Sequence, residues 1–153
     1  MGVLLRPARD EDADAYVRLW TDPEVRRFLG GPLEPARVAA RLRGLAGCPG
    51  VLTAEVGGIV VGTVSVEPDS RFAAPEISYA FLPEHGGRGH ARAAVGAVLR
   101  RWPAAVAVTQ VANIRSQRLL TALGMAEVAR FAEFGAVQAL HRVVTGARGC
   151  ACR

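Results

Sequence analysis

The chain has 153 residues and a formal net charge of +5; half of its residues are apolar and 22% are charged. This length and composition predict one globular domain with a sizeable core and exclude a disordered chain. All 19 basic residues are arginine. The lack of lysine excludes a phosphate loop that needs Gly-Lys-Ser/Thr, and it excludes enzymes that work through a lysine Schiff base. The positive charge favours an anionic partner: a phosphorylated cofactor, an acidic substrate or nucleic acid.

The cellular setting is predicted from what the sequence lacks. No apolar run reaches the ~18 residues of a membrane helix, and residues 1–6 lack the apolar stretch of a signal peptide. The three cysteines, Cys48, Cys150 and Cys152, are an odd number and do not make a disulfide framework. We therefore expect a reduced, cytoplasmic protein with no membrane partner. No histidine and cysteine set has metal-ligand spacing, so we expect no metal.

Hydrophobic periodicity and turn residues divide the chain into alternating strands and helices. The predicted elements are a strand over 4–8, a helix over 11–21, a short helix from Asp22-Pro23 to Gly30-Gly31, a helix that opens at Glu34-Pro35, strands over 51–56 and 59–66, a strand over 76–82, a helix over 91–102, a strand over 105–111, a helix from Asn113 to Leu123, and strands over 125–133 and 136–144. Two-residue hairpin turns are predicted at Gly57-Gly58 and Phe134-Gly135.

The strands over 76–82 and 105–111 are separated by the strongest predicted helix. This spacing suits a parallel strand pair with a helical crossover, whereas the remaining neighbours are hairpins. The sequence therefore predicts a single α/β domain with about four helices and a mixed, mostly antiparallel sheet that contains a central parallel pair. We expect the domain to span residues 1–145 and residues 146–153 to form a flexible C-terminal tail.

A glycine-rich segment, residues 83–91 (Pro-Glu-His-Gly-Gly-Arg-Gly-His-Ala), joins the strand over 76–82 to the following helix. Glycines let the backbone approach a ligand, and the unpaired N–H groups of a helix start attract phosphate. Arg88 and Arg92 are candidates for added positive charge. A turn that only starts the helix explains the same residues equally well. A dinucleotide-binding fold fits poorly, because Arg92 stands where its fingerprint needs a small residue.

A second polar segment opens the helix that begins after Asn113. Ser116 shares a helix face with the apolar residues Leu119, Leu120 and Leu123. A hydroxyl on an inward face needs a partner. Considered alone, the segment is explained most simply by Asn113 as an N-cap and Ser116 bonded locally.

Taken in order, these segments resemble the GNAT-superfamily N-acetyltransferases over nearly the whole chain. The resemblance is closest to the branch that contains the ribosomal-protein alanine N-acetyltransferases. The motifs that carry it are Leu5-Arg6-Pro7, Asp22-Pro23-Glu24-Val25, Glu76-Ile77-Ser78-Tyr79, Gly87-Arg88-Gly89-His90-Ala91, and Asn113 and Ser116 followed by Leu123-Gly124-Met125. Each motif is common by chance, whereas the ordered set is much more specific.

The resemblance implies that acetyl-CoA lies where the strands over 76–82 and 105–111 splay apart. The implied cofactor-binding residues are Phe81 and Leu82, whose backbone would bond the pantetheine arm; Gly86, Gly87, Arg88, Gly89, His90 and Ala91, at the pyrophosphate; Asn113, near the pantetheine or acetyl region; and Ser116, close to the thiol. In such enzymes an amine attacks the thioester directly in a ternary complex. Phe28 and Leu29 are implied to line the acceptor pocket.

The resemblance also implies two catalytic residues, Glu76 as general base and Ser116 as general acid. For Glu76, a surface carboxylate near the strand start is an equally supported alternative. The chain departs from the family at two positions. Gly86 replaces the usual Arg or Gln that begins the pyrophosphate loop, and Leu120 replaces a tyrosine that serves many members as general acid.

The predicted function is acetyl transfer from acetyl-CoA to a primary amine, either a peptide N-terminus or a small molecule. The two departures keep open an alternative, a non-catalytic module that binds CoA or a partner. A nucleic-acid partner is not expected, because the arginines are scattered without an aromatic-plus-basic stripe. The sequence is compatible with a monomer or a homodimer.

Overall fold

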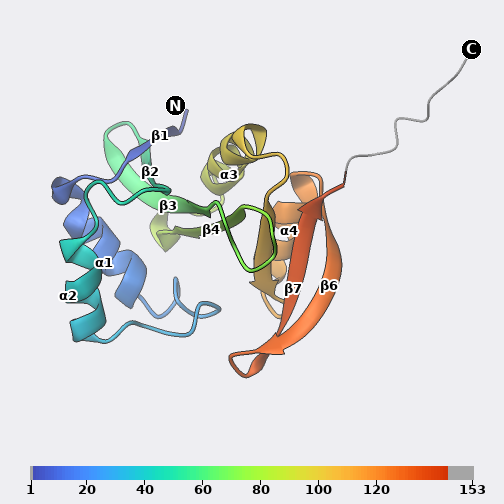
Figure 1. The fold of residues 1–153 in the computed structure, drawn as a ribbon. Coiled ribbons are helices and arrows are strands. Elements are labelled where there is room, and N and C mark those ends of the chain that lie inside the picture. Colours follow the sequence, from blue (N-terminus) through green and yellow to red (C-terminus); the bar gives the residue numbers. More distant parts are fainter. Residues whose placement is uncertain (1, 145–153) are drawn as a thin grey trace, which may run out of the picture.

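The computed structural model describes residues 2–144, so the expected tail at 146–153 lies outside the described residues. One sheet of seven strands has the order β1-β2-β3-β4-β5-β7-β6 (Figure 1). The elements are β1 (Leu4–Pro7), α1 (Ala13–Thr21), α2 (Pro35–Arg43), β2 (Val51–Val56), β3 (Ile59–Glu67), β4 (Glu76–Phe81), α3 (His90–Arg101), β5 (Val106–Gln110), α4 (Ile114–Ala122), β6 (Met125–Glu133) and β7 (Ala136–Val143). Short 3-10 turns occupy Asp10–Asp12 and Pro83–His85.

The predicted fold class is confirmed. Neighbouring strands pair antiparallel except for β4 and β5, which are parallel and joined through α3. Both predicted hairpin turns form: Gly57 and Gly58 have φ of 57° and 82°, and Phe134 and Gly135 have φ of 55° and 72°. Positive φ at both central residues is what a type I′ turn requires. None of the helices within residues 2–144 is long and apolar enough to cross a membrane.

The short helix predicted to begin at Asp22-Pro23 is wrong. Residues 23–30 form successive turns instead. The Asp22 carboxylate accepts from the N–H groups of Glu24 and Val25, and the Arg26 side chain donates to the carbonyls of Leu29 and Gly31. Such side-chain bonds offer the backbone an alternative to a helical ladder.

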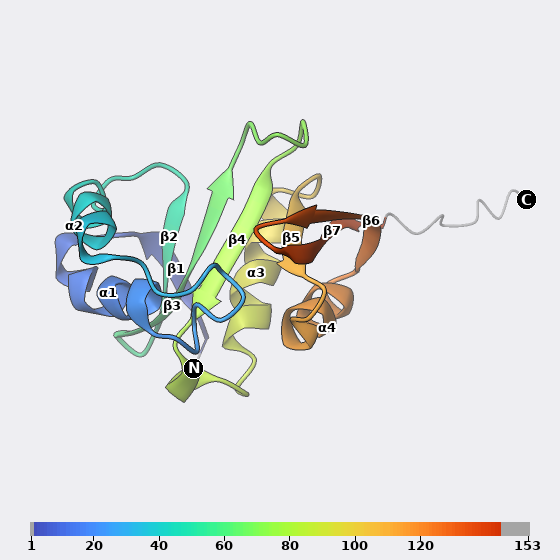
Figure 2. The same ribbon diagram turned by 90° about the horizontal axis from the view of Figure 1, so that it is seen from below.

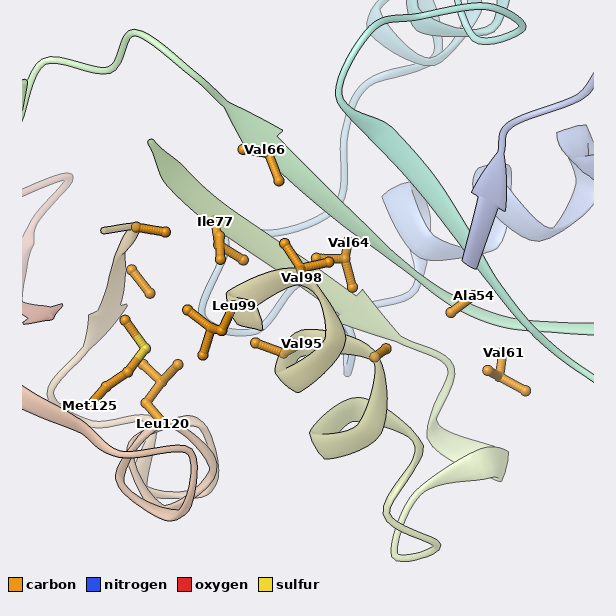
Figure 3. Close-up of a cluster of buried hydrophobic side chains, with 13 residues drawn as sticks. Ala54, Val61, Val64, Val66, Ile77, Val95, Val98, Leu99, Leu120 and Met125 are labelled. Atoms are coloured by element: carbon orange, nitrogen blue, oxygen red, sulfur yellow. The ribbon is translucent and has the colours of Figure 1, made fainter. Parts of the chain in front are cut away.

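The larger hydrophobic core lies between the sheet and the helices α3 and α4 (Figure 3). Val64 of β3, Ile77 of β4, Val95 of α3 and Leu120 of α4 meet there, and each is at most 2% exposed. Burying a side chain of this size stabilises the fold by roughly 1.5–3 kcal/mol. This core therefore fixes α3, and with it the loop before α3, against β4.

The opposite face of the sheet carries α1 and α2 (Figure 2). The smaller cluster on that face consists of Ala8, Tyr16, Leu19, Leu45 and Leu82. Side chains of β4 alternate between the two faces, as the geometry of a strand requires: Ile77, Tyr79 and Phe81 pack with the larger core, whereas Ala80 packs with the smaller one. Successive residues of β4 thus face different layers.

A buried polar network joins β1 and β2 to the start of α1. Arg6 donates two hydrogen bonds of 2.8 Å to Asp12 and one of 2.7 Å to Glu55. Asp12 also accepts from Thr53, which in turn bonds the hydroxyl of Tyr16. The arginine lowers the pKa of Asp12, whose side chain is only 4% exposed. Arg6 of the Leu5-Arg6-Pro7 motif therefore has a structural role.

Candidate active site

The parallel strands β4 and β5 stay together over a short distance only. Within the described chain their ladder has two register pairs, Glu76 with Val106 and Ile77 with Ala107. Beyond these pairs β4 continues beside β3, and β5 continues beside β7. Figure 2 shows β5 and β7 turning away from the line of β4. From residue 78 on, β4 therefore presents an open strand edge, which is suited to pair with an extended ligand.

The glycine-rich loop follows at the end of this open edge. Gly87 and Gly89 have φ of 74° and 77°, a left-handed conformation that favours glycine. Gly89 is the N-cap of α3 and provides no side-chain cap. The N–H groups of the first turn are therefore available to an anion, and the helix dipole adds positive potential. Residues 86–89 are exposed, and the predicted cofactor segment from Gly86 to Ala91 lies at this helix start.

Gly86 is overlaid by an arginine from a different helix. A Cβ atom at Gly86 would lie 3.0 Å from Nη2 of Arg115 and 3.1 Å from the carbonyl oxygen of Pro83. Arg115 belongs to the first turn of α4 and is exposed. The loop thus lacks a side chain at its first glycine but has a guanidinium at the same place. The sequence analysis missed Arg115, because no local pattern indicates that α4 begins beside this loop.

The 3-10 turn before the loop is fixed to α1 by an ion pair. Arg18 donates two hydrogen bonds to the carboxylate of Glu84, one of them 3.0 Å long. This contact lowers the pKa of Glu84 to about 2. The ion pair thus ties Glu84, and with it the start of the loop, to α1.

Phe81 and Leu82 offer different backbone groups to a ligand. Leu82 donates its N–H to Val61 at 2.8 Å, and its carbonyl accepts from His85 at 3.1 Å. Phe81 is the last residue of β4 and lies opposite Gly62 of β3 in the strand register. Because both backbone groups of Leu82 already form hydrogen bonds within the protein, the backbone of Phe81 is better placed to pair with an extended arm.

Two hydroxyl groups meet between β4 and α4. The Oδ1 atom of Asn113 accepts from the N–H of Ser116 at 3.2 Å, so the N-cap interpretation of Asn113 is confirmed. The Ser116 hydroxyl does not bond locally, because it forms a hydrogen bond with the hydroxyl of Tyr79. Burial raises the pKa of Tyr79. Sequence reasoning did not single out Tyr79 as functional, because only the folded chain brings its strand face against Ser116.

Glu76 lies at the start of β4, on the face opposite Tyr79. It is half-buried, and this burial raises the pKa of its carboxyl. The neighbouring carboxylates of Glu67 and Glu133 raise it further, whereas Arg71, which is paired with Glu133, lowers it. Glu76 is thus a half-buried carboxylate among charged neighbours at the start of β4. Among residues 2–144, no hydrogen bond joins it to the two hydroxyl groups.

The other residues that the sequence predicted for the site lie in the loop, at the start of α3 and in the turns after α1. Arg88 is exposed in the loop, and His90 begins α3. Phe28 is half-buried beneath the guanidinium of Arg27, and Leu29 is exposed. The described residues contain no group of three or more histidine, cysteine, aspartate or glutamate side chains that could hold a metal ion.

A mixed sheet whose parallel pair separates beside a glycine-rich helix start is the architecture that the resemblance implied for acetyltransferases. Comparison with known families agrees, since the model of the acetyltransferase (GNAT) domain matches residues 3–126. The chain belongs to this family. Membership in the ribosomal-protein alanine branch stays a prediction.

Solved structures with the same fold include three acetyltransferases. A GNAT-family acetyltransferase from Bacillus anthracis is 18% identical with a TM-score of 0.80, over 92% of this chain and 93% of that one. The spermidine N-acetyltransferase from Vibrio cholerae, in complex with CoA and spermine, is 16% identical with a TM-score of 0.74, over 91% and 94%. An acetyltransferase from Agrobacterium tumefaciens is 21% identical with a TM-score of 0.71, over 90% and 89%. At these identities the likeness concerns the fold.

Proposed function

We propose that the protein moves the acetyl group of acetyl-CoA to a primary amine by direct attack in a ternary complex. The observation that carries the proposal is the separation of β4 from β5 beyond Ile77, directly before the loop that opens α3. An extended thioester can pair with the open edge of β4 while its phosphates reach the helix start. The family and the CoA complex of the V. cholerae relative support this use of the site.

Binding is divided between backbone and side chains. The N–H groups from Gly87 to Ala91 would hold the pyrophosphate, with charge supplied by Arg88 and Arg115. The N–H of Gly86 already donates to the carbonyl of Pro83 at 3.0 Å. The backbone of Phe81 would pair with the pantetheine arm. Asn113 uses Oδ1 for its helix cap, which leaves its amide nitrogen to donate to the arm or to the acetyl group.

The chemistry requires a neutral amine and a leaving thiolate. Glu76 would take the proton of the amine, directly or through water, and its raised pKa brings its basicity closer to this task. Ser116 would donate a proton to the sulfur. No acyl-enzyme is needed, because positioning the two substrates supplies much of the acceleration.

The acceptor in this proposal is a peptide N-terminus or a small-molecule amine. The spermidine N-acetyltransferase with the same fold supports a small-molecule amine as one of these acceptors. The likeness to the ribosomal-protein branch favours a peptide. We further propose a cytoplasmic protein, monomeric or homodimeric, that acts without nucleic acid, membrane or metal.

Calorimetric titration of the full chain with acetyl-CoA, with NADH as the control, tests the proposal. Micromolar binding of acetyl-CoA alone supports it. The next measurement is release of free CoA thiol with a panel of N-terminal peptides and polyamines. Absence of acetyl-CoA binding contradicts the proposal, whereas tight binding without turnover of any amine favours the non-catalytic module.

A further inference from the structure

The hydrogen bond between Tyr79 and Ser116 joins two parts of the molecule that are 37 residues apart in the sequence. Tyr79 lies on β4 beyond the last residue that pairs with β5, and Ser116 lies in the first turn of α4, which follows β5. The two hydroxyl groups therefore meet across the separation of the parallel strands. This is the place where the proposed function puts the reacting thioester.

The surroundings of the pair hold it in position. The Tyr79 ring packs against the larger core, and its hydroxyl has Ser116 as its hydrogen-bond partner within residues 2–144. The backbone N–H of Ser116 is fixed by Asn113. A serine hydroxyl has one proton and two lone pairs. While Ser116 accepts from the phenol, its own proton is free to be donated to a third group.

We propose that Tyr79 supplies, through the hydroxyl of Ser116, the proton that the leaving CoA thiolate takes up. The inference rests on the proposed acetyl transfer and assigns one residue beyond it. Ser116 touches the sulfur, and Tyr79 is a positioning residue that acts through Ser116.

The step is balanced in atoms and charge. The amine nitrogen forms a bond to the acetyl carbon, and the C–S bond breaks with its electron pair left on sulfur. Sulfur takes the Ser116 proton, and Ser116 takes the phenolic proton of Tyr79. The nitrogen gives its surplus proton to Glu76 or to water, and the phenolate regains a proton from solvent.

The relative acidity of the groups explains why a phenol is useful here. An aliphatic hydroxyl is a far weaker acid than a phenol, whose ordinary pKa of about 10 is close to the 8.5 of a thiol. Proton transfer is efficient when donor and acceptor are closely matched. Burial raises the pKa of Tyr79, which widens the difference from the thiol but leaves the phenol a much stronger acid than the serine hydroxyl.

The Tyr79→Phe variant tests the inference, since it removes only the hydroxyl and leaves the ring in the core. We expect kcat to fall roughly 10²-fold, at the lower end of general acid catalysis, while KM for acetyl-CoA stays within about twofold. The Ser116→Ala variant should lose a similar factor, and Ser116→Thr, which keeps a hydroxyl, should recover most of it. The double variant Tyr79→Phe/Ser116→Ala should be little slower than Ser116→Ala, because the two act as one relay.

Tyr16→Phe is the matched control. Tyr16 is the only other tyrosine of the chain, and its hydroxyl bonds Thr53 and Thr63 in the smaller cluster. This variant should lose stability without the loss in kcat. An unchanged kcat in Tyr79→Phe, or equal losses in both tyrosine variants that follow their melting temperatures, would overturn the inference.

A second measurement needs no acceptor amine. If the relay donates to sulfur, bound CoA should favour its thiolate, and calorimetry in two buffers of different ionisation enthalpy should detect proton release on CoA binding near pH 8. Tyr79→Phe should abolish this release and leave acetyl-CoA affinity unchanged. Proton release that persists in the variant overturns the inference alone, whereas a wild-type chain that binds no acetyl-CoA overturns the proposed function.

Discussion

Arg115 stands with its Nη2 atom 3.0 Å from the point that a Cβ atom of Gly86 would occupy. A side chain at position 86 and the side chain of Arg115 would compete for the same space. Because residue 86 is glycine, the Arg115 side chain from the first turn of α4 occupies that space. A guanidinium beside the N-terminus of α3 adds to the positive potential of that helix end. The two positive groups, the guanidinium and the helix N-terminus, stabilise an anion that binds between them.

Arg115→Ala should weaken acetyl-CoA binding roughly 10- to 100-fold, because a hydrogen bond to a charged group contributes roughly 1.5–3 kcal/mol. Arg118→Ala removes an exposed arginine one turn later on the same helix and should change the affinity little. Adding Gly86→Arg to Arg115→Ala should restore part of the binding, since the Arg115 guanidinium then no longer competes for the space and only a small shift of the Pro83 carbonyl, 3.1 Å from the new Cβ atom, is needed. Calorimetry measures all three, and equal affinities for the two single variants would remove Arg115 from the site.

Gly89→Glu should abolish acetyl-CoA binding. Gly89 has φ of 77°, so any side chain is strained there by roughly 1–2 kcal/mol, and a carboxylate would repel phosphate. Gly58→Glu is a control with the same strain, because Gly58 has φ of 82° in the hairpin between β2 and β3. Both variants should melt at lower temperature, and only Gly89→Glu should lose the ligand. Retained affinity in Gly89→Glu would show that the phosphates bind elsewhere.

The sequence predicted the fold well because its signals are local. Periodicity placed α3 and β4 nearly to the residue, and Gly57-Gly58 marked its hairpin directly. The turns after Asp22 escaped prediction because they depend on where the Arg26 side chain donates. Contacts in the site that depend on the folded position of a side chain escaped prediction for the same reason.

Within the site, the loop could be predicted because its glycines and the helix start are adjacent in sequence. The contacts of Arg115 with Gly86 and of Tyr79 with Ser116 could not, because each joins residues that only tertiary packing brings together. The sequence predicted an inward position for Ser116 and made no such prediction for Tyr79. The hydrogen bond between their hydroxyl groups depends on how far β4 and β5 diverge, which the sequence does not specify.

Asn113 has a cap role that is shown and a ligand role that is proposed, and two variants separate them. Asn113→Ala should cost about 1 kcal/mol of stability through the lost N-cap. Asn113→Asp keeps the capping oxygen and removes the amide donor, so its melting temperature should be close to wild type. If the amide contacts the substrate, Asn113→Asp should nevertheless weaken acetyl-CoA binding or turnover. Full activity in the Asp variant would reduce Asn113 to a helix cap.

Glu76→Gln should lower kcat and remove the acidic limb of the pH–rate profile, since a general base works only when deprotonated. The raised pKa of Glu76 places this limb above the ordinary range of a glutamate. Glu67→Gln removes a carboxylate that raises this pKa, so the limb should move to lower pH. Arg71→Ala removes a charge that lowers it, so the limb should move to higher pH. An acidic limb that is unaffected by both neighbours does not belong to Glu76.

Asp12 should make the stability of the fold depend on acid. Its pKa is lower in the folded chain than the ordinary value of 3.8, because Arg6 binds the charged form. A lowered folded pKa means that the unfolded chain binds more protons, so stability rises with pH in that range. The contribution is complete above the unfolded value and is lost as pH falls through the folded one. Asp12→Asn leaves Arg6 without its main partner and should cost roughly 3–5 kcal/mol near neutral pH. Urea unfolding from pH 7 to pH 3 should show the wild-type advantage shrink with acid, and a constant difference would mean that Asp12 does not titrate between the two states.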